Sequence, residues 1–330
     1  MGSGTVSTGR PLRGQARFPQ PVETVPDPVS RIGEVRLIER LRRVLGPPGP
    51  GVRVGIGDDA AVLTARRGWT LLASDMCVEG VHFRLTGRAG TPPEWVGWKA
   101  LAVNVSDIAA MGGLPQAAVV SLGAPPQAPV REIERIYRGL RRCAKRFGIS
   151  VVGGDTVRAP RLVIDVAILG TVAPGRAVLR SGARVGDALF VTGRLGGSYA
   201  SGRHARFVPR VREAQALLKR VRVHAMMDLS DGLALDLWQM ARASRVTLRI
   251  EAARIPRHAA AKTLHHALQD GEDFELLFAV APRDAARVPR RLGACPVTRI
   301  GRVVRRGAGV ELAKADGRMQ RVRPSGFRHF

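Results

Sequence analysis

The stretch MMDLSDGLALDL, residues 226–237, sets two aspartates three positions apart directly after an apolar pair, in a loop that leads into a helix. Asp228 and Asp231 would repel each other unless an arginine, a proton or a metal ion neutralises them. The pairing is unexpected in a chain that carries 53 Lys+Arg against 27 Asp+Glu. Apolar segments that end in aspartate recur at 58–59, 75, 107 and 155. This recurrence indicates that several aspartates could meet at one candidate site in the folded chain.

Outward from this stretch, short apolar segments alternate with helical patterns, which predicts an α/β or α+β fold. Helices are expected after the loop at 226–232 and over 93–113, 130–148 and 211–221. Strands are expected over 70–83 (turning at Gly80), 117–125, 149–155, 161–174, 187–198, 246–256 and 274–282. A short basic region is expected to close the chain.

Two of the helices show their ends in the sequence. The helix over 93–113 stops at Gly112-Gly113 and is expected to be amphipathic, with Asp107 beside its apolar stripe. The helix over 130–148 places one apolar stripe on a charged background and ends at Gly148. Its stripe consists of Ile133, Ile136, Tyr137, Leu140, Ala144 and Phe147.

The length of 330 residues accommodates two domains of ordinary size, and 45% hydrophobic residues can fill their cores. We expect a flexible extension over 1–30, which is rich in Pro, Gly and Ser, and a first domain over 31–173. A second domain is expected over 174–330. No repeat of 20–50 residues is present, which argues against a solenoid.

The formal net charge of +26 comes mostly from arginine, because only five of the 53 basic residues are lysines. The arginines are scattered along the chain and aromatic residues make up only 5%. A nucleic-acid footprint is clustered, so we expect a solvated arginine-rich surface and no specific nucleic-acid partner, although anionic substrates would be attracted.

The three cysteines, Cys77, Cys143 and Cys295, form no CxxC pair or other metal-ligand spacing. Unpaired thiols of this kind are typical of a reduced, cytoplasmic protein. No apolar run reaches the length of a membrane-spanning helix, so no membrane partner is expected.

Each aspartate that ends an apolar segment has an ordinary explanation, since Gly-Asp favours turns and Asp often caps helices. The group is more informative than its members. Carboxylates at strand ends and loop starts are the hard oxygen ligands that Mg²⁺ requires, and Mg²⁺ commonly bridges carboxylates to nucleotide phosphates. The sequence therefore predicts a magnesium site, with cations between Asp228 and Asp231.

Several common enzyme classes lack their motifs here. There is no G-x-x-x-x-G-K-[ST] loop, and no H-R-D and D-F-G pair of a protein kinase. G-x-S-x-G and H-E-x-x-H are also absent, which disfavours an α/β-hydrolase or a zincin.

Seven motifs in order closely resemble the thiamine-monophosphate kinase family, within the aminoimidazole ribonucleotide synthetase superfamily. They are GIGDDAAVL, SDMCVEGVHF, WKALAVNVSDIAAMGG, VVGGDTV, LRSGARVGD, MDLSDGLALDL and GEDFELLF, and the resemblance covers about residues 31–330. It implies phosphorylation of thiamine monophosphate by ATP with several Mg²⁺ ions. It also implies a two-domain α/β fold whose N-terminal mixed-sheet domain dimerises, while its C-terminal domain is α/β.

The resemblance assigns roles residue by residue. Of the metal ligands, Asp75, Asp155 and Asp231 are also expected to be catalytic. The implied metal ligands are Asp59, Ser74, Asp75, Asp107, Asp155, Asp228 and Asp231. The implied nucleotide contacts are Tyr137, Gly154, Asp155, Arg180 and Ser230. Tyr137 fits core packing equally well, because it lies on the apolar stripe of its helix. The planar guanidinium of Arg180 would suit a phosphate.

On the substrate side the resemblance points to His82, Glu272 and Phe327. His82 could donate to the substrate, Glu272 could receive the aminopyrimidine, and Phe327 could stack on the cationic thiazolium ring. Two positions depart from the family pattern, because Ala73 replaces a hydroxyl residue and Arg328 replaces an acid near the C-terminus.

Two alternatives stay open from the sequence. One is another ATP-dependent synthetase of the same superfamily that acts on a different substrate. The other, from a different class, is a basic nucleic-acid-binding protein on an enzyme scaffold, which would bind DNA in a salt-sensitive way without turning over ATP.

Overall fold

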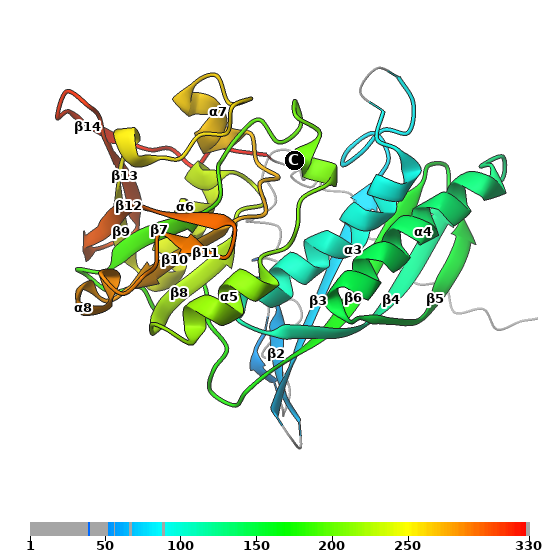
Figure 1. The fold of residues 1–330 in the computed structure, drawn as a ribbon, viewed down its shortest axis with the longest axis horizontal. Coiled ribbons are helices and arrows are strands. Elements are labelled where there is room, and N and C mark those ends of the chain that lie inside the picture. The colour runs from blue at the N-terminus through cyan, green and yellow to red at the C-terminus, as the bar shows by residue number, and fades with distance from the viewer. Residues whose placement is uncertain (1–38, 40–51, 56, 66–67, 88–89, 328–330) are drawn as a thin grey trace, which may run out of the picture.

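A computed structural model describes residues 39, 52–55, 57–65, 68–87 and 90–327 of the chain (Figure 1). The expected extension over 1–30 and Arg328 lie outside the described residues. The chain forms two sheets side by side, each with its own helices, and the N-terminal one is at the right of Figure 1. Residues 173–187 connect the two sheets, and the predicted domain boundary lies at the start of this segment.

The N-terminal half is a six-stranded mixed sheet in the order β1-β2-β3-β6-β4-β5, in which only β4 and β5 run parallel. Its helices are α3 (Pro93–Ala110) and α4 (Val130–Phe147). Its strands are β1 (Val52–Val54), β2 (Ala61–Ala65), β3 (Gly68–Val78), β4 (Leu114–Ala124), β5 (Ser150–Arg158) and β6 (Val163–Val172). The two helices lie against one face of the sheet (Figure 1). The opposite face carries exposed apolar side chains, Leu72, Met76, Val119 and Leu169.

Helices α3 and α4 approach each other at two glycines. A Cβ atom at Gly97 would lie 1.8 Å from the carbonyl oxygen of Ile136, and one at Gly139 would lie 1.7 Å from that of Glu94. No side chain fits at either contact, so these glycines set the distance between the helices. Helix α4 also confirms the predicted stripe, and Gly148 ends it in the left-handed conformation at φ 69°.

Helix α3 is the centre of the molecule and differs from the amphipathic expectation. Nearly all of its side chains are buried, including Lys99, Asn104 and Ser106, because β3, α4 and the second half surround it. A helix that is apolar all round is typical of a buried position. The expectation was wrong because the sequence alone does not show that the C-terminal half covers the second face of α3.

The C-terminal half is an eight-stranded mixed sheet in the order β14-β13-β9-β12-β7-β10-β8, with β11 paired to β12. Only β13 and β9 run parallel. Its strands are β7 (Ala188–Thr192), β8 (Val223–Asp228), β9 (Val246–Glu251), β10 (Leu276–Val280), β11 (Arg291–Leu292), β12 (Cys295–Arg306), β13 (Gly309–Ala313) and β14 (Met319–Arg321). Its helices are α5 (Val211–Leu218), α6 (Leu233–Ser244), α7 (Leu264–Gln269) and α8 (Pro282–Ala285), with 3₁₀ turns η1 (Arg203–Ala205) and η2 (Ala252–Arg254).

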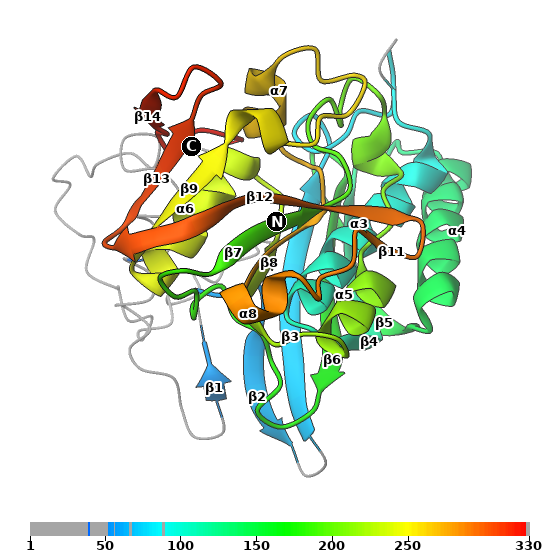
Figure 2. The same ribbon diagram turned by 60° about the vertical axis from the view of Figure 1, so that its left-hand side comes forward.

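The end of the chain is folded and is not the short basic region that the sequence predicted. Strand β12 pairs with both β9 and β7, and it lies across the sheet in Figure 2. Ile300 and Val303 are buried on this strand while Arg299, Arg302 and Arg305 are exposed. Arginines between the apolar positions gave the segment its basic composition, although the alternation itself is typical of a half-buried strand.

Apolar clusters cover both faces of this second sheet. One lies between the sheet and α6, and the other lies with α5, where the rings of Phe190 and Phe278 stack at 5.4 Å. Ala110 from the end of α3 joins the second cluster. The two-part α/β fold is confirmed, and its junction is built around α3. None of the described helices is both long and apolar enough to cross a membrane.

Candidate active site

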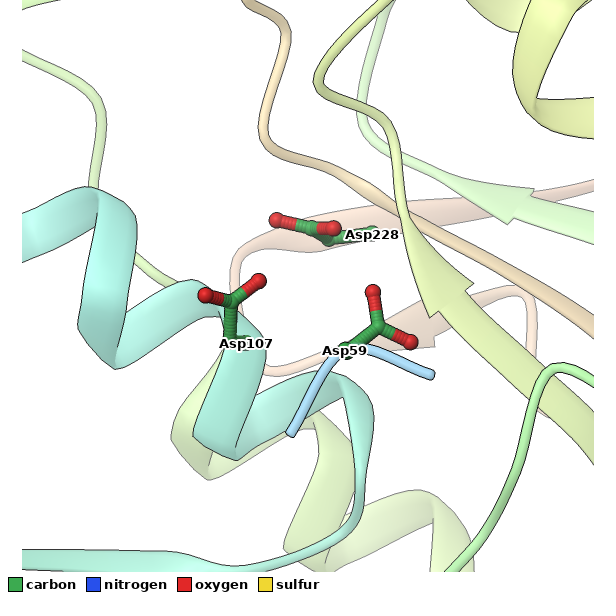
Figure 3. A group of neighbouring side chains, drawn as sticks. All are labelled: Asp59, Asp107 and Asp228. Atoms are coloured by element: carbon green, nitrogen blue, oxygen red, sulfur yellow. The ribbon is translucent and has the colours of Figure 1, made fainter. Parts of the chain in front are cut away.

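Three aspartates from distant parts of the chain meet at the junction. Asp59 precedes β2, Asp107 lies on α3 and Asp228 ends β8 (Figure 3). Each offers a carboxylate oxygen, and these oxygens all lie within 4.8 Å of one another. Asp59 and Asp228 are buried and Asp107 is half-buried. Three of the predicted acids therefore converge in the folded chain, with carboxylates from both halves.

Buried polar groups on α3 hold the Asp228 carboxylate and the backbone of Asp75 in place. Ser106 donates to Oδ2 of Asp228 at 2.5 Å, and Asn104 accepts a hydrogen bond from the backbone N–H of Asp75 at 3.0 Å. Asp75 lies on the helix side of β3, near enough to the Asp107 carboxyl group for each to affect the pKa of the other. Asp75 is thus the fourth acid of the cluster.

Burial dominates the protonation of this cluster. It raises the pKa of Asp107 and Asp228 well above the usual range, and neighbouring aspartates raise both further. It likewise raises the pKa of Asp75. At Asp58, burial and then Asp59 raise the pKa to about 7. The cause is that a low-dielectric site disfavours several negative charges without a compensating cation.

One arginine only partly compensates these charges. Arg180 donates to Oδ1 of Asp59 at 2.8 Å and to the side-chain oxygen of Gln239 at 2.7 Å. Gln239 in turn donates to Asp231 at 3.0 Å, so a polar chain joins Asp59 to Asp231. Burial alone would lower the pKa of Arg180, but the surrounding carboxylates raise it. Arg180 is therefore a fixed cation at the edge of the cluster.

The donor set fits a divalent cation. Oδ2 of Asp59 is buried and makes no hydrogen bond among the described residues, so it presents an unused acceptor to the cluster. All the converging ligands are carboxylate oxygens, as Mg²⁺ prefers. Their 4.8 Å spread is close to the roughly 4.2 Å between opposite oxygens around Mg²⁺. Small side-chain movements would close the difference.

The predicted substrate residues meet around Lys99, about two turns before Asp107 on the same helix. The rings of His82 and Phe327 lie 6.3 Å apart. Lys99, which is only 1% exposed, forms an ion pair with Glu272 and donates to the backbone carbonyl of His82 at 2.8 Å. Nδ1 of His82 accepts from the N–H of Val78 at 3.0 Å, which assigns the proton of a neutral ring to Nε2.

The loop that carries Glu272 rests on the loop after β8. The N–H of Glu272 donates to the carbonyl of Ser230 at 2.6 Å, and that of Phe327 donates to the carbonyl of Asp231 at 2.9 Å. Glu272 and Phe274 have φ angles of 53° and 49°, in a region that non-glycine residues rarely adopt. Such backbone strain clusters at functional sites. The contacts place the substrate side next to Ser230 and Asp231.

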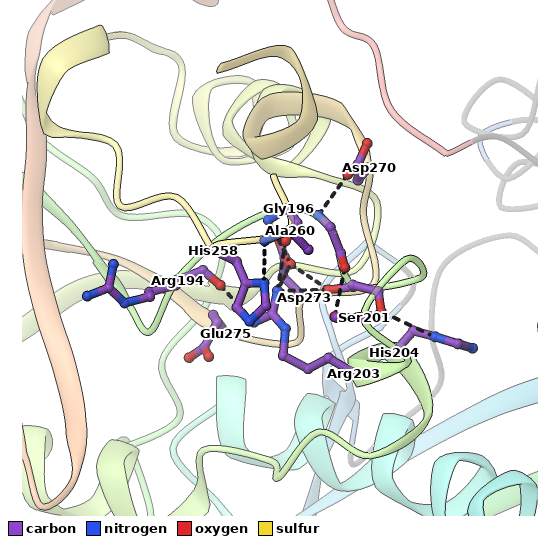
Figure 4. A network of polar contacts seen from close by, with 12 residues as sticks. Arg194, Gly196, Ser201, Arg203, His204, His258, Ala260, Asp270, Asp273 and Glu275 are labelled. Atoms are coloured by element: carbon purple, nitrogen blue, oxygen red, sulfur yellow. Dashed lines mark hydrogen bonds and ion pairs between the residues drawn. The ribbon is translucent and has the colours of Figure 1, made fainter. Parts of the chain in front are cut away.

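A network of buried charged side chains holds the loop that contains Glu272 (Figure 4). Asp273 accepts from Ser198 and Arg203, both at 2.7 Å, and from the N–H of Gly196. Glu275 accepts two hydrogen bonds from Arg210, at 2.5 and 2.7 Å. Burial nevertheless raises the pKa of Asp273 to about 6. The network fixes the backbone that follows Glu272.

Four predicted residues do not reach the cluster within one chain. Asp155 lies on the edge strand β5, in register with Ser121, Asp165 and Met76, so three strand spacings of about 4.8 Å separate it from β3. The Ser74 hydroxyl points to the open face of β3, opposite to Asp75, and donates to Asp165 at 3.1 Å.

The other two have structural explanations. A Cβ atom at Gly154 would lie 1.8 Å from the carbonyl oxygen of Val120, so glycine is needed there for strand pairing. Tyr137 packs against the N-terminal core, and burial raises its pKa. Their predicted nucleotide contacts stay predictions.

The sequence interpretation did not single out Lys99, Gln239, Asn104 or Ser106. For Lys99 a signal existed, because it is one of only five lysines and stands in the apolar run EWVGWKALAV. A charged residue in such a run calls for a buried partner. Gln239, Asn104 and Ser106 act through contacts between segments far apart in sequence, which no local pattern shows.

Comparison with known proteins identifies the family to which the two halves of the chain belong. Residues 57–172 match the AIR synthase related protein, N-terminal domain, and residues 184–313 match the AIR synthase related protein, C-terminal domain. The chain also resembles a solved structure described as AaThiL complexed with AMPPCP and TMP, with a TM-score of 0.80, 32% identity and coverage of 93% of this chain and 100% of that one.

Curated relatives agree with the structural match. The thiamine-monophosphate kinase of Rhodopirellula baltica is 41% identical over 304 residues, which cover 85% of this chain and 92% of that protein. The Bacillus subtilis enzyme of the same name is 37% identical over 311 residues, with coverage of 84% and 94%. The chain therefore belongs to the thiamine-monophosphate kinase family of AIR-synthase-related proteins.

Proposed function

We propose that this protein phosphorylates thiamine monophosphate with ATP and Mg²⁺, giving thiamine diphosphate and ADP. The observation that carries the proposal is the junction itself. The oxygens of Asp59, Asp107 and Asp228 converge within 4.8 Å, next to the loop that joins Ser230 and Asp231 to Glu272 and Phe327. The carboxylate cluster thus adjoins a group formed by a histidine, a carboxylate and an aromatic ring, which supports binding of a metal ion beside the substrate.

The reaction is a direct in-line transfer. An oxygen of the thiamine phosphate forms a bond to the γ-phosphorus, while the bond from that phosphorus to the β–γ bridging oxygen breaks and its electrons leave with ADP. The attacking phosphate is already ionised at neutral pH, so no strong general base is required. The protein supplies position and charge, which carry most of the catalysis of phosphoryl transfer.

The carboxylates have a holding role in this reaction. Asp59, Asp75, Asp107 and Asp228 would bind Mg²⁺. Asp231 would bind Mg²⁺ next to them, because Gln239 and Arg180 connect it to Asp59. Bound Mg²⁺ would draw charge from the phosphoryl oxygens and offset the repulsion between two polyanions. Arg180, fixed by Asp59 and Gln239, is placed to add a positive charge for a phosphate.

Three residues of the substrate side, Glu272, His82 and Phe327, each offer a contact to thiamine. Lys99 holds one oxygen of Glu272, and the remaining oxygen is available to the aminopyrimidine. The Nε2–H of His82 is a donor for the substrate. Phe327 is 37% exposed and presents a ring face to the cationic thiazolium.

We also propose a homodimer formed through the open face of the N-terminal sheet. Leu72, Met76, Val119 and Leu169 are 39–51% exposed on this face, and apolar patches of this kind mark interfaces. Asp155 lies on the edge strand of this sheet, where it pairs with Ser121, and does not reach the carboxylate cluster of its own chain. Its predicted metal role therefore depends on a second chain at this face. Met76→Asp combined with Leu169→Asp should produce monomers in light scattering, and an unchanged mass would contradict the interface.

The three cysteines are unpaired and buried, which supports a reducing, cytoplasmic location. Cytoplasmic recovery after fractionation of cells that express the natural protein would test this proposal, and secretion would contradict it.

The decisive assay combines the purified protein with Mg-ATP and thiamine monophosphate and measures thiamine diphosphate. Free thiamine serves as the control acceptor, because it lacks the attacking phosphate. We expect thiamine diphosphate when thiamine monophosphate is the acceptor and none when free thiamine is the acceptor. Failure to form thiamine diphosphate at saturating substrates, by a protein that binds Mg-ATP, would overturn the proposal in favour of another acceptor.

A further inference from the structure

A large cavity lies at the other end of β8 from Asp228. Its volume is about 1330 Å³, and both halves of the chain line it. The lining comes from the turn after α3, the connecting segment 171–184, residues 215–224 and α8 with the residues that follow it. Helices α5 and α8 both contribute lining residues beside the start of β8. The cavity shares no lining residue with the carboxylate cluster.

Positive charge dominates this cavity. Asp284 is its only acidic lining residue, and it already pairs with Arg287 at 3.1 Å. In an adjoining cavity of about 430 Å³, Asp187 pairs with His224 at 2.9 Å. Six further lining cations have no carboxylate partner within the part of the chain that the structure describes: Arg176, Arg184, Lys219, Arg220, Arg222 and Arg283.

Six like charges around one cavity repel one another and raise the local positive potential. The potential attracts anions, and a concave site focuses it more than a flat surface does. The cavity therefore calls for an anion of several charges.

The lining residues narrow the chemistry of that anion. They include no Phe, Tyr or Trp, and their one imidazole, His224, is paired with Asp187, so a nucleobase finds no large aromatic ring on which to stack. Five of the six cations are arginines, whose planar forks bind phosphate oxygens in pairs. A nucleic-acid duplex would reach only the rim of a concave site. We propose that the cavity binds a linear polyphosphate group, carried by inorganic polyphosphate or by a nucleoside polyphosphate.

This polyphosphate site is separate from the proposed active site. His224 and Asp228 lie four residues apart on β8, which corresponds to about 13 Å at roughly 3.3 Å per residue. The connecting segment reaches both places, because Leu179 and Ser181 line the cavity while Arg180 between them binds Asp59. A ligand in the cavity thus contacts the neighbours of an active-site cation.

Calorimetric titration of the full chain with tripolyphosphate tests the proposal. The buffer contains EDTA, because without divalent ions the carboxylate cluster repels polyphosphate. The triple variant Arg220→Glu, Arg222→Glu and Arg283→Glu should bind at least about tenfold more weakly than the parent. The control variant Arg141→Glu, Arg146→Glu and Arg290→Glu changes the net charge equally at exposed positions elsewhere and should bind within about twofold of the parent.

Matching circular dichroism and melting temperature in the cavity variant establish that it is folded, and the milder Arg222→Gln provides a second comparison. Adenosine 5′-tetraphosphate and tripolyphosphate distinguish the two sources of the ligand, and tighter binding of either supports a polyphosphate site. Absence of binding to the parent, or equal losses in both triple variants, would overturn the proposal. Displacement of tripolyphosphate by single-stranded RNA at a lower concentration would overturn it as well. Kinase activity is measured separately, so failure of the proposed reaction would leave this result standing.

Discussion

The metal side and the substrate side of the junction share helix α3 but handle buried charge in opposite ways. Asp107 belongs to a group of like charges in which burial raises the pKa, and Arg180 is the one cation among the described residues that compensates them. Lys99 lies eight residues earlier, about 12 Å along the helix, and neutralises Glu272 within the protein. One side needs an external cation and the other does not.

This difference separates the two tasks of the site. A group of carboxylates that the protein leaves under-compensated gains most from binding a metal ion, at a cost in stability of the metal-free fold. A paired lysine and carboxylate instead hold a recognition group at a fixed position. Removing a charge should therefore have opposite effects on stability at Asp107 and at Lys99.

The largest effect is expected from Asp107→Asn on the metal side. Loss of a metal ligand should lower kcat by about 10³-fold or more, which corresponds to roughly 4 kcal/mol. The metal-free variant should melt at a higher temperature than the parent, because a buried, repelled charge has been removed. Steady-state kinetics and thermal denaturation in EDTA measure the two effects.

Asp75→Asn and Asp231→Asn should also abolish turnover while the fold stays intact. Asp316→Asn is the matched control, since Asp316 lies exposed in the β13–β14 turn against Arg318 and should change neither quantity. Near-normal rates in the three site variants would contradict the metal assignment.

Lys99→Met should have the next largest effect, and of the opposite sign on stability. It leaves Glu272 without its cation, and removal of one partner of a buried pair costs about 3–5 kcal/mol. Because the Glu272 side chain is 22% exposed, about 2–3 kcal/mol is expected here. The KM for thiamine monophosphate should rise about tenfold, since Glu272 and His82 both lose their anchor.

The double variant Lys99→Met with Glu272→Gln separates positioning from packing. It should regain most of the lost stability, because no unpaired charge remains, but it should keep the raised KM. If Lys99→Met alone melts at the parent's temperature, the ion pair does not organise the substrate side.

A smaller effect is expected on the pH dependence of the melting temperature. Burial, and then Asp59, raise the pKa of Asp58 from 3.8 to about 7, and burial raises that of Asp107. A carboxyl group with a raised pKa binds its proton more tightly in the folded state, so its stabilising effect is full below 3.8 and is lost as the pH rises through the folded value. In EDTA, the melting temperature should fall more steeply between about pH 5 and pH 8 for the parent than for Asp107→Asn.

Excess Mg²⁺ should flatten this dependence in the parent, because the metal competes with the protons for the same oxygens. Identical slopes for the parent and Asp107→Asn in EDTA would show that the cluster is not the titrating unit.

Local patterns in the sequence were sufficient for much of the fold. The stripe and Gly148 of α4 predict that helix because capping and periodicity are local. Strand β12 was missed, since arginines between its apolar positions gave it a basic composition. The burial of α3 on every side depends on the second half of the chain, which no window of the sequence contains.

The site divides in the same way. Apolar segments ending in aspartate led to Asp59, Asp75, Asp107 and Asp228, which the fold brings together because strand ends and α3 meet at the junction. The same pattern also led to Asp155, which β5 places on a distant edge of the sheet. Lys99 was not recognised as a site residue, since its partners Glu272 and His82 are distant in sequence.

The smallest effect is expected at Phe327, where the substrate side has an uncharged contact. A cation–π interaction at an exposed position contributes about 0.5–1 kcal/mol, and Phe327 is 37% exposed. Phe327→Leu should therefore raise the KM for thiamine monophosphate about threefold without changing kcat, whereas Phe327→Tyr keeps the ring and should behave like the parent. If Leu and Tyr raise the KM equally, the ring face does not contact the thiazolium. Charge pairing at Lys99 would then account for the substrate side without help from the C-terminal segment.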